Sequence, residues 1–223
     1  AAALARASSY GLESLWLAIQ GDDFKAGRAG GRMYHELGVL RDLGADCPWM
    51  DYLYGNYDYF AGTVPRLIRI LGSILGIPPG DRARGLRRLQ RAATTPSVVQ
   101  WEAVRTLVYI YLFYEHDYDR ALEWGRRLIA VYPENLTHRL FLLRAAVHGE
   151  GWAEADAIWQ DWVAWAIVRG AELPEITWTE AVYWRARWYM HTGQWEAAEQ
   201  WLRYLLAMPR ARPPWLDAWV RLS

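Results

Sequence analysis

The chain has 223 residues, of which 53% are hydrophobic, and its 25 basic and 25 acidic residues give a formal net charge of zero. This composition is ample for a buried core and excludes a disordered chain, and the neutral balance disfavours nucleic acid or an anionic membrane as the main partner. The single cysteine, Cys47, excludes an internal disulfide and a cysteine-based metal cluster.

Glycine, proline and aspartate residues divide the chain into a series of predicted helices. The first covers residues 2 to 19, with Leu4, Leu12, Leu15, Trp16 and Ile19 on one face. The second begins after Asp22 and runs to about residue 43, and another begins at Pro48 and is interrupted or bent near Gly55. Later helices are predicted over 83–93, 96–115, 118–131, 136–148, 152–169, 175–191, 195–208 and 215–222.

A short pattern recurs along the second half, in which an aromatic residue stands three positions before an alanine. It occurs in YDRA at 118–121, WAEA at 152–155 and WEAA at 195–198. The first two alanines are 34 residues apart, and the last two are 43 apart, which indicates an insertion of about nine residues. A period of 34 residues is typical of stacked helix-turn-helix repeats that share one core.

Tyr118, Ala121, Leu128 and Pro133, followed by Glu-Asn, resemble the tetratricopeptide repeat family over residues 96 to 209. The resemblance implies an all-α fold, an α-α solenoid that binds protein through the first helix of each pair. Phe24 with Gly27, and Gly85 with Arg82 in the place of the aromatic, have the same spacing in divergent units. The predicted parts are a divergent helix pair (1–44), an inserted segment with a divergent helix (45–95), the repeats (96–209) and a capping helix (210–223).

The insertion combines an aromatic segment at 49–60 with an apolar segment at 64–77. We interpret the apolar segment as a buried or docking helix. A helix lying on a membrane surface is the alternative, although two arginines are few cations for that role. The chain has no run of 18 apolar residues, so no transmembrane helix is predicted. It begins AAALARASS without Met, which indicates a processed or partial product.

Counting back from the repeat alanines predicts a peptide-binding groove on the first helices. Steps of seven, eleven and fifteen residues give the candidate partner-binding residues, which are Thr106, Ile110, Tyr114, Arg144, His148, Tyr183, Arg187 and His191. Guanidinium groups bind carboxylates through two hydrogen bonds, so the expected partner is an extended peptide with acidic groups. The alternative is that the insertion before Ala198 shifts the register and that the arginines face solvent or pair with glutamate.

The sequence does not indicate an enzyme. Its five histidines lack a zinc-binding spacing, no phosphate-binding glycine loop follows a strand, and no cofactor is expected. Asp51 and Asp58 resemble the carboxylate pair of a glycan-cleaving cleft, but solvated helix positions are the simpler interpretation.

The function expected from these patterns is a non-enzymatic scaffold or adaptor for protein partners. A similarity to a bacterial tetratricopeptide subgroup often exported to the cell envelope implies a subunit of an envelope assembly, in the periplasm or envelope. The similarity lies in the order of Gly-Asn-Tyr, a proline-bounded apolar helix, then Asp-Arg and Gly-Leu-x-x-Leu. The alternative function is carbohydrate binding or processing on a helical solenoid, with the aromatic segment 49–60 as the sugar platform.

Overall fold

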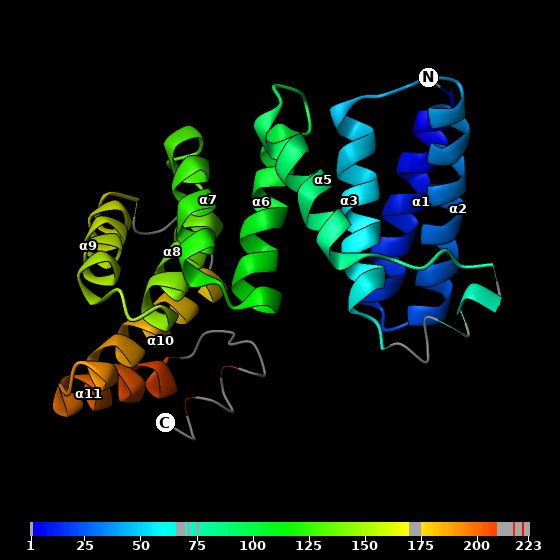
Figure 1. Ribbon diagram of the computed structural model, residues 1–223. Helices are drawn as coiled ribbons and strands as arrows, with labels where there is room; N and C mark the ends of the chain where they lie inside the picture. Colours follow the sequence, from blue (N-terminus) through cyan, green and yellow to red (C-terminus); the bar gives the residue numbers. More distant parts are fainter. Residues whose placement is uncertain are drawn as a thin grey trace. The chain divides into compact units, whose positions relative to one another are not determined.

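The computed structural model describes residues 2–65, 70, 72–74, 76–169, 175–208, 216 and 220, and these residues form helices and connecting turns without a strand. The chain divides into two compact units, Ala1–Leu107 and Val108–Ser223. Helix α6 (Gln100–Ile110) crosses this boundary (Figure 1). The prediction of an all-α fold is therefore confirmed over the described residues.

In the first unit, α1 (Ala2–Ile19) and α2 (Asp23–Asp42) form a helical hairpin, and α3 (Pro48–Thr63) pairs with α5 (Arg82–Thr94) (Figure 1). Asp22 and Asp81 accept hydrogen bonds from backbone N–H groups in the first turns of α2 and α5, which explains why both helices begin there. A core of apolar and aromatic side chains joins α1, α2 and α3. It contains Ala7, Met33, Leu37, Met50, Leu53, Tyr54 and Tyr57.

Helix α3 is continuous through Gly55, so the predicted interruption there is wrong. The glycine instead permits close contact with α5, because a Cβ atom at Gly55 would lie 2.8 Å from Leu89 Cγ. Gly85 meets the same contact from the α5 side, where its Cβ would lie 2.8 Å from the Gly55 carbonyl oxygen. These two glycines therefore mark the crossing of the two helices.

The second unit contains a π-helical turn η1 (Tyr111–Glu115), α7 (Tyr118–Val131), α8 (Leu136–His148), α9 (Trp152–Arg169), α10 (Glu175–His191) and α11 (Trp195–Ala207). Neighbouring helices pack in sequence, and α8 also packs on α10. The helix bounds predicted over 118–131, 136–148, 152–169 and 175–191 agree with the structure.

The three repeat alanines occupy matching positions. Ala121, Ala155 and Ala198 are each the fourth residue of a helix and at most 2% exposed, and each N–H donates to the carbonyl oxygen just before that helix. In the first unit Gly85 has this position in α5. In α2 the corresponding buried residue is Ala26, one position before the expected Gly27. A small residue is thus buried at the same point of five helices.

Two predicted segments lie largely outside the described residues. In the apolar segment 64–77, Ile70 and Ile74 are exposed, and Leu67, Ile68, Leu71 and Leu75 are not described. In the predicted capping helix, Leu216 and Val220 are buried, and the other residues from 209 onward are not described. Within the described residues, no helix is both long and apolar enough to cross a membrane.

Candidate binding site

Two Arg-His pairs occupy matching positions on α8 and α10. Arg144 precedes His148 by four residues, Arg187 precedes His191 by four residues, and each histidine is the last residue of its helix. Residues four apart lie on the same face of a helix, so each pair presents an arginine and an imidazole together. Because α8 packs on α10, the two pairs belong to neighbouring elements of the second unit.

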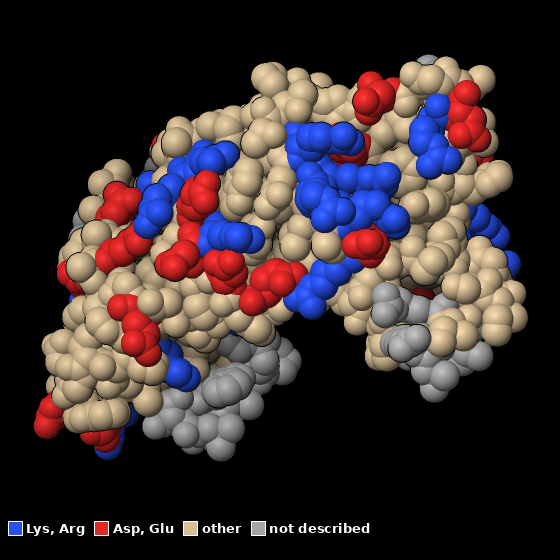
Figure 2. Space-filling view, in the orientation of Figure 1, with Lys and Arg blue, Asp and Glu red and all other residues tan. Residues whose placement is uncertain are grey.

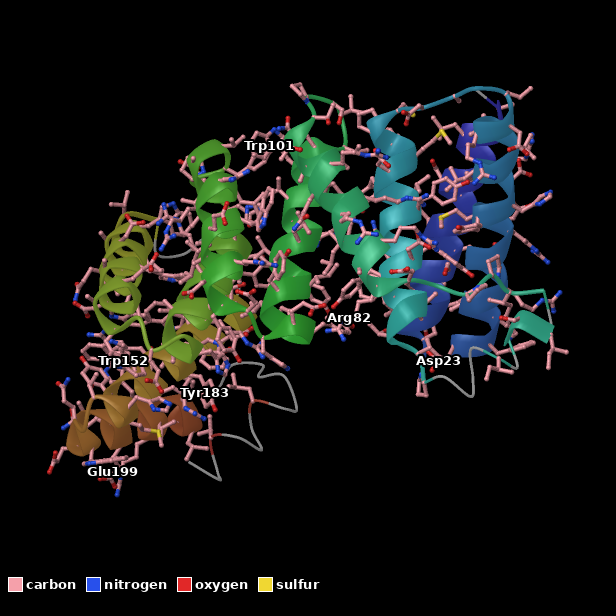
Figure 3. The ribbon with its side chains drawn as sticks, in the orientation of Figure 1. Asp23, Arg82, Trp101, Trp152, Tyr183 and Glu199 are labelled. Atoms are coloured by element: carbon pink, nitrogen blue, oxygen red, sulfur yellow. The ribbon has the colours of Figure 1, made fainter. Side chains whose placement is uncertain are left out.

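Each histidine stacks on the aromatic residue that opens an earlier helix. The His148 ring lies 5.2 Å from that of Tyr118 at an interplanar angle of 12°, and His191 lies 5.3 Å from Trp152 at 23°. Tyr118 begins α7 and Trp152 begins α9; Trp152 is labelled in Figure 3. The same geometry therefore recurs in two successive helix pairs, built by the aromatic residues that had marked the repeat.

Arg144 is held between aromatic rings. Its guanidinium carbon lies 4.3 Å from the centre of the Phe113 ring and 5.0 Å from that of Trp184, which is a cation-π arrangement. The nearest carboxylate, that of Glu180, is 3.8 Å away, beyond hydrogen-bonding distance. The Nε atom of Arg144 is buried without a partner. Burial lowers the pKa of Arg144 and raises that of Glu180.

Arg187 has polar partners but no carboxylate among them. Its Nη1 donates to the Tyr183 hydroxyl at 3.4 Å, its Nη2 is 3.3 Å from His191 Nε2, and its Nε is buried without a partner. Both arginines thus have hydrogen-bonding capacity that no carboxylate satisfies in the part of the chain that the structure describes. Their arrangement is suited to an anion with two oxygens, such as a carboxylate.

His148 reports how close these groups are. Desolvation between Tyr118 and Trp184 lowers its pKa to about 4, and the positive charges of Arg144 and Arg187 lower it further. The ring is therefore neutral at pH 7, whereas the arginines remain charged. The site combines two cations with neutral, planar walls.

The structure separates the eight predicted residues into two groups. Tyr114, Arg144, His148, Arg187 and His191 are at least partly exposed, whereas Thr106, Ile110 and Tyr183 are buried at 6%, 0% and 2% exposure. Thr106 also belongs to the first unit, and Tyr183 enters the site through its hydroxyl alone. Figure 3 labels Tyr183 on α10.

The π-helical turn η1 explains why Ile110 is in the core. Counting back from Ala121 assumed α-helical geometry, but a π turn adds one residue and rotates the preceding face. The residues beside the site are accordingly Tyr109, which is 37% exposed, and Phe113, whose ring centre is 4.7 Å from that of Tyr109. The positions expected for Ile110 and Tyr114 are therefore each displaced by one residue.

Sequence reasoning missed Phe113, Trp184 and Glu180 and assigned Tyr118 and Trp152 no role in the site. The available signal was the repeat itself, since both of the latter open the helices that carry the repeat alanines. Nothing in the local sequence marks Phe113 or Glu180.

The carboxylates Asp51 and Asp58 are neither a catalytic pair nor solvated, which corrects the sequence interpretation. Arg84 of α5 donates two hydrogen bonds to Asp58, at 2.8 and 2.7 Å, and Arg88 donates a third at 3.0 Å. Arg91 binds Asp51 in the same two-pronged way. Figure 2 shows these arginine side chains as the large blue group on the first unit.

The aromatic segment 49–60 largely faces the protein interior. Tyr54, Tyr57 and Tyr59 are 4%, 8% and 0% exposed, so their ring faces are closed to a sugar. The described residues contain no group of three or more His, Cys, Asp or Glu side chains that could hold a metal ion.

Comparison with known proteins adds no assignment. No protein-family model, no curated protein and no solved structure matches this chain.

Proposed function

We propose that this chain is a non-enzymatic, tetratricopeptide-like solenoid scaffold that binds an extended acidic peptide on the face formed by α8 and α10. The observation that carries the proposal is the recurrence of one arrangement: an Arg-His pair whose histidine stacks on the aromatic residue opening an earlier helix. Repetition along neighbouring helices is how solenoids read successive positions of an extended ligand.

The solenoid part of the proposal is supported by the small buried residue that recurs at the fourth position of α5, α7, α9 and α11. It is also supported by the packing of α8 on both α7 and α9 and on α10. The sequence similarity described above favours a role as a subunit of a bacterial envelope assembly.

The choice of an acidic ligand follows from the charges. Arg187 pairs with a hydroxyl and an imidazole, and Arg144 is stacked on rings at 4.3 and 5.0 Å while its carboxylate neighbour stays 3.8 Å away. A carboxylate from a partner would supply the acceptors that these guanidinium groups lack. Charge-assisted hydrogen bonds to such groups stabilise a complex by about 1.5–3 kcal/mol each.

The test is peptide binding measured by fluorescence anisotropy. The probes are labelled ten-residue peptides that differ in Glu against Gln side chains and in a free against an amidated C-terminus. We expect the wild type to prefer acidic peptides, and Arg187→Gln to lower that affinity by roughly tenfold or more. Arg203→Gln on α11 is the matched control, because Arg203 is exposed and pairs with Glu199.

Equal affinity for Glu and Gln peptides, or unchanged affinity in Arg187→Gln, would contradict the proposal. Thermal unfolding of both variants separates a binding defect from a folding defect.

A further inference from the structure

A cavity of about 350 Å³ opens in the first unit between α2, α3 and residues 76–78. This volume is within the range that small-molecule sites occupy. The rings of Tyr34 and Tyr54 and the backbone of Gly38 line it, with Arg41 and Asp42 at one end and Pro78 at the other. A Cβ atom added at Gly38 would meet nothing within 4 Å, so this wall is open.

The chain itself shows what kind of group this surface accepts. Residues 77 and 78 lie against two other glycines of α2, since Cβ atoms at Gly27 and Gly31 would lie 3.5 Å from Ile77 and Pro78 side chains. The Tyr57 hydroxyl donates a 2.7 Å hydrogen bond to the Pro78 carbonyl oxygen. An apolar body on the glycine face and an acceptor on a tyrosine hydroxyl thus satisfy the neighbouring position.

Tyr54 offers the same donor without an acceptor. It precedes Tyr57 by three residues on α3, and the Tyr34 ring contacts both, at 4.8 and 4.9 Å between ring centres. Tyr54 is 4% exposed and lines the cavity, yet its hydroxyl has no partner among the described residues. An unsatisfied buried donor is costly, so a ligand that accepts from it gains that free energy.

The charges at the cavity favour a carboxylate as this acceptor. The Arg41 side chain is 62% exposed, and its contact with adjacent Asp42 is 3.5 Å, at the limit of a hydrogen bond. The Arg88 guanidinium lies 4.3 Å from the centre of the Tyr54 ring and adds positive potential. The carboxylate of Asp42 at the cavity end repels a second negative charge on the ligand.

We propose that this cavity binds a small monocarboxylic acid with an apolar body. One carboxylate oxygen accepts a hydrogen bond from the Tyr54 hydroxyl, the other pairs with Arg41, and the apolar body lies on Gly38 beside Tyr34. The carboxylate belongs either to a free acid or to the C-terminus of a peptide, and the site is independent of the peptide face on α8 and α10.

Saturation-transfer NMR on the intact chain tests the proposal with 3-phenylpropionate and its amide, 3-phenylpropanamide. Acetyl-Ala-Phe with a free or amidated C-terminus tests the peptide source. We expect the acids to bind and the amides to bind at least tenfold more weakly, because hydrogen bonds to charged groups are the stronger ones. Binding of the free acid alone, or of the acid-terminated peptide as well, identifies the source.

Two variants localise the binding. Gly38→Leu fills the cavity from its open wall and should abolish binding, and Tyr54→Phe removes the hydroxyl while keeping the ring and should weaken binding by roughly 10- to 100-fold. Arg187→Gln in the second unit should change nothing. Absence of saturation transfer from every acid, or full binding by a folded Gly38→Leu variant, would overturn the proposal.

Discussion

Arg84 grips Asp58 through two parallel hydrogen bonds, of 2.8 and 2.7 Å, and the carboxylate that it holds is completely buried. Arg88 adds a third bond to the same carboxylate. The carboxylate raises the pKa of Arg84, which reflects how strongly it favours the charged guanidinium. Together with the Arg91 pair on Asp51, this network joins α5 to α3 along their length.

We expect Asp58→Ala to lower the free energy of unfolding by about 3–5 kcal/mol, because it leaves two guanidinium groups without their buried acceptor. Chemical denaturation followed by circular dichroism measures the change. Glu199→Ala is the control, since Glu199 and Arg203 are both exposed and such pairs contribute about 0–1 kcal/mol. Equal effects of the two substitutions would show that Asp58 is not structural.

Gly85→Ala should destabilise the protein by about 1–3 kcal/mol, because the added methyl group meets the backbone of α3 at the helix crossing. Its Cβ would lie 2.8 Å from both the Gly55 carbonyl oxygen and Tyr59 Cα, and backbone atoms cannot move aside as a flexible side chain can. Gly38→Ala is the matched substitution in an open position. It should stabilise the protein by about 0.5–1 kcal/mol, so thermal melting points of the two variants should shift in opposite directions.

Arg185 should tolerate lysine poorly. It is 5% exposed, its guanidinium carbon lies 4.0 Å from the Trp188 ring centre and 4.6 Å from that of Tyr189, and it bonds Asp156 at 2.6 Å. A lysine ammonium cannot stack as a plane on these rings while bonding the carboxylate. We expect Arg185→Lys to cost about 1–3 kcal/mol in urea denaturation and to alter tryptophan emission. Arg203→Lys on the exposed side of α11 should do neither.

Acidification should destabilise the second unit through His148. Its pKa in the folded chain is about 4, below the value of an unfolded histidine, so the unfolded state binds the additional proton. The stabilisation is therefore complete above pH 6.5 and is lost as the pH falls toward 4. Arg144, Arg187, His116 and His191 all disfavour the charged ring.

Glu180 acts in the opposite direction, because its raised pKa favours the folded state at low pH. The measurement is the melting temperature between pH 7 and 4 for the wild type and His148→Gln. The variant should lose less stability over this range. A parallel decline in both proteins would rule out His148 as the source.

The sequence determined the local organisation of this protein. Asp22, Asp81 and Asp117 accept from backbone N–H groups where helices begin, and the recurring aromatic and alanine residues identified matching helices. These signals are short-range, so they can be read without knowing which helices pack together. The pairing of Arg144 with His148, and of Arg187 with His191, was available for the same reason, since both depend on helical periodicity.

Tertiary packing decided which side chains are exposed. The stripe of Leu12, Leu15, Trp16 and Ile19 on α1 is 59–69% exposed, while the tyrosines of α3 are buried. One π turn displaced Ile110 from the site, and arginines 26 to 40 residues away converted Asp51 and Asp58 into buried structural groups. Such outcomes depend on which surfaces meet across long sequence separations, and hydrophobic and charged patterns within one helix do not encode that choice.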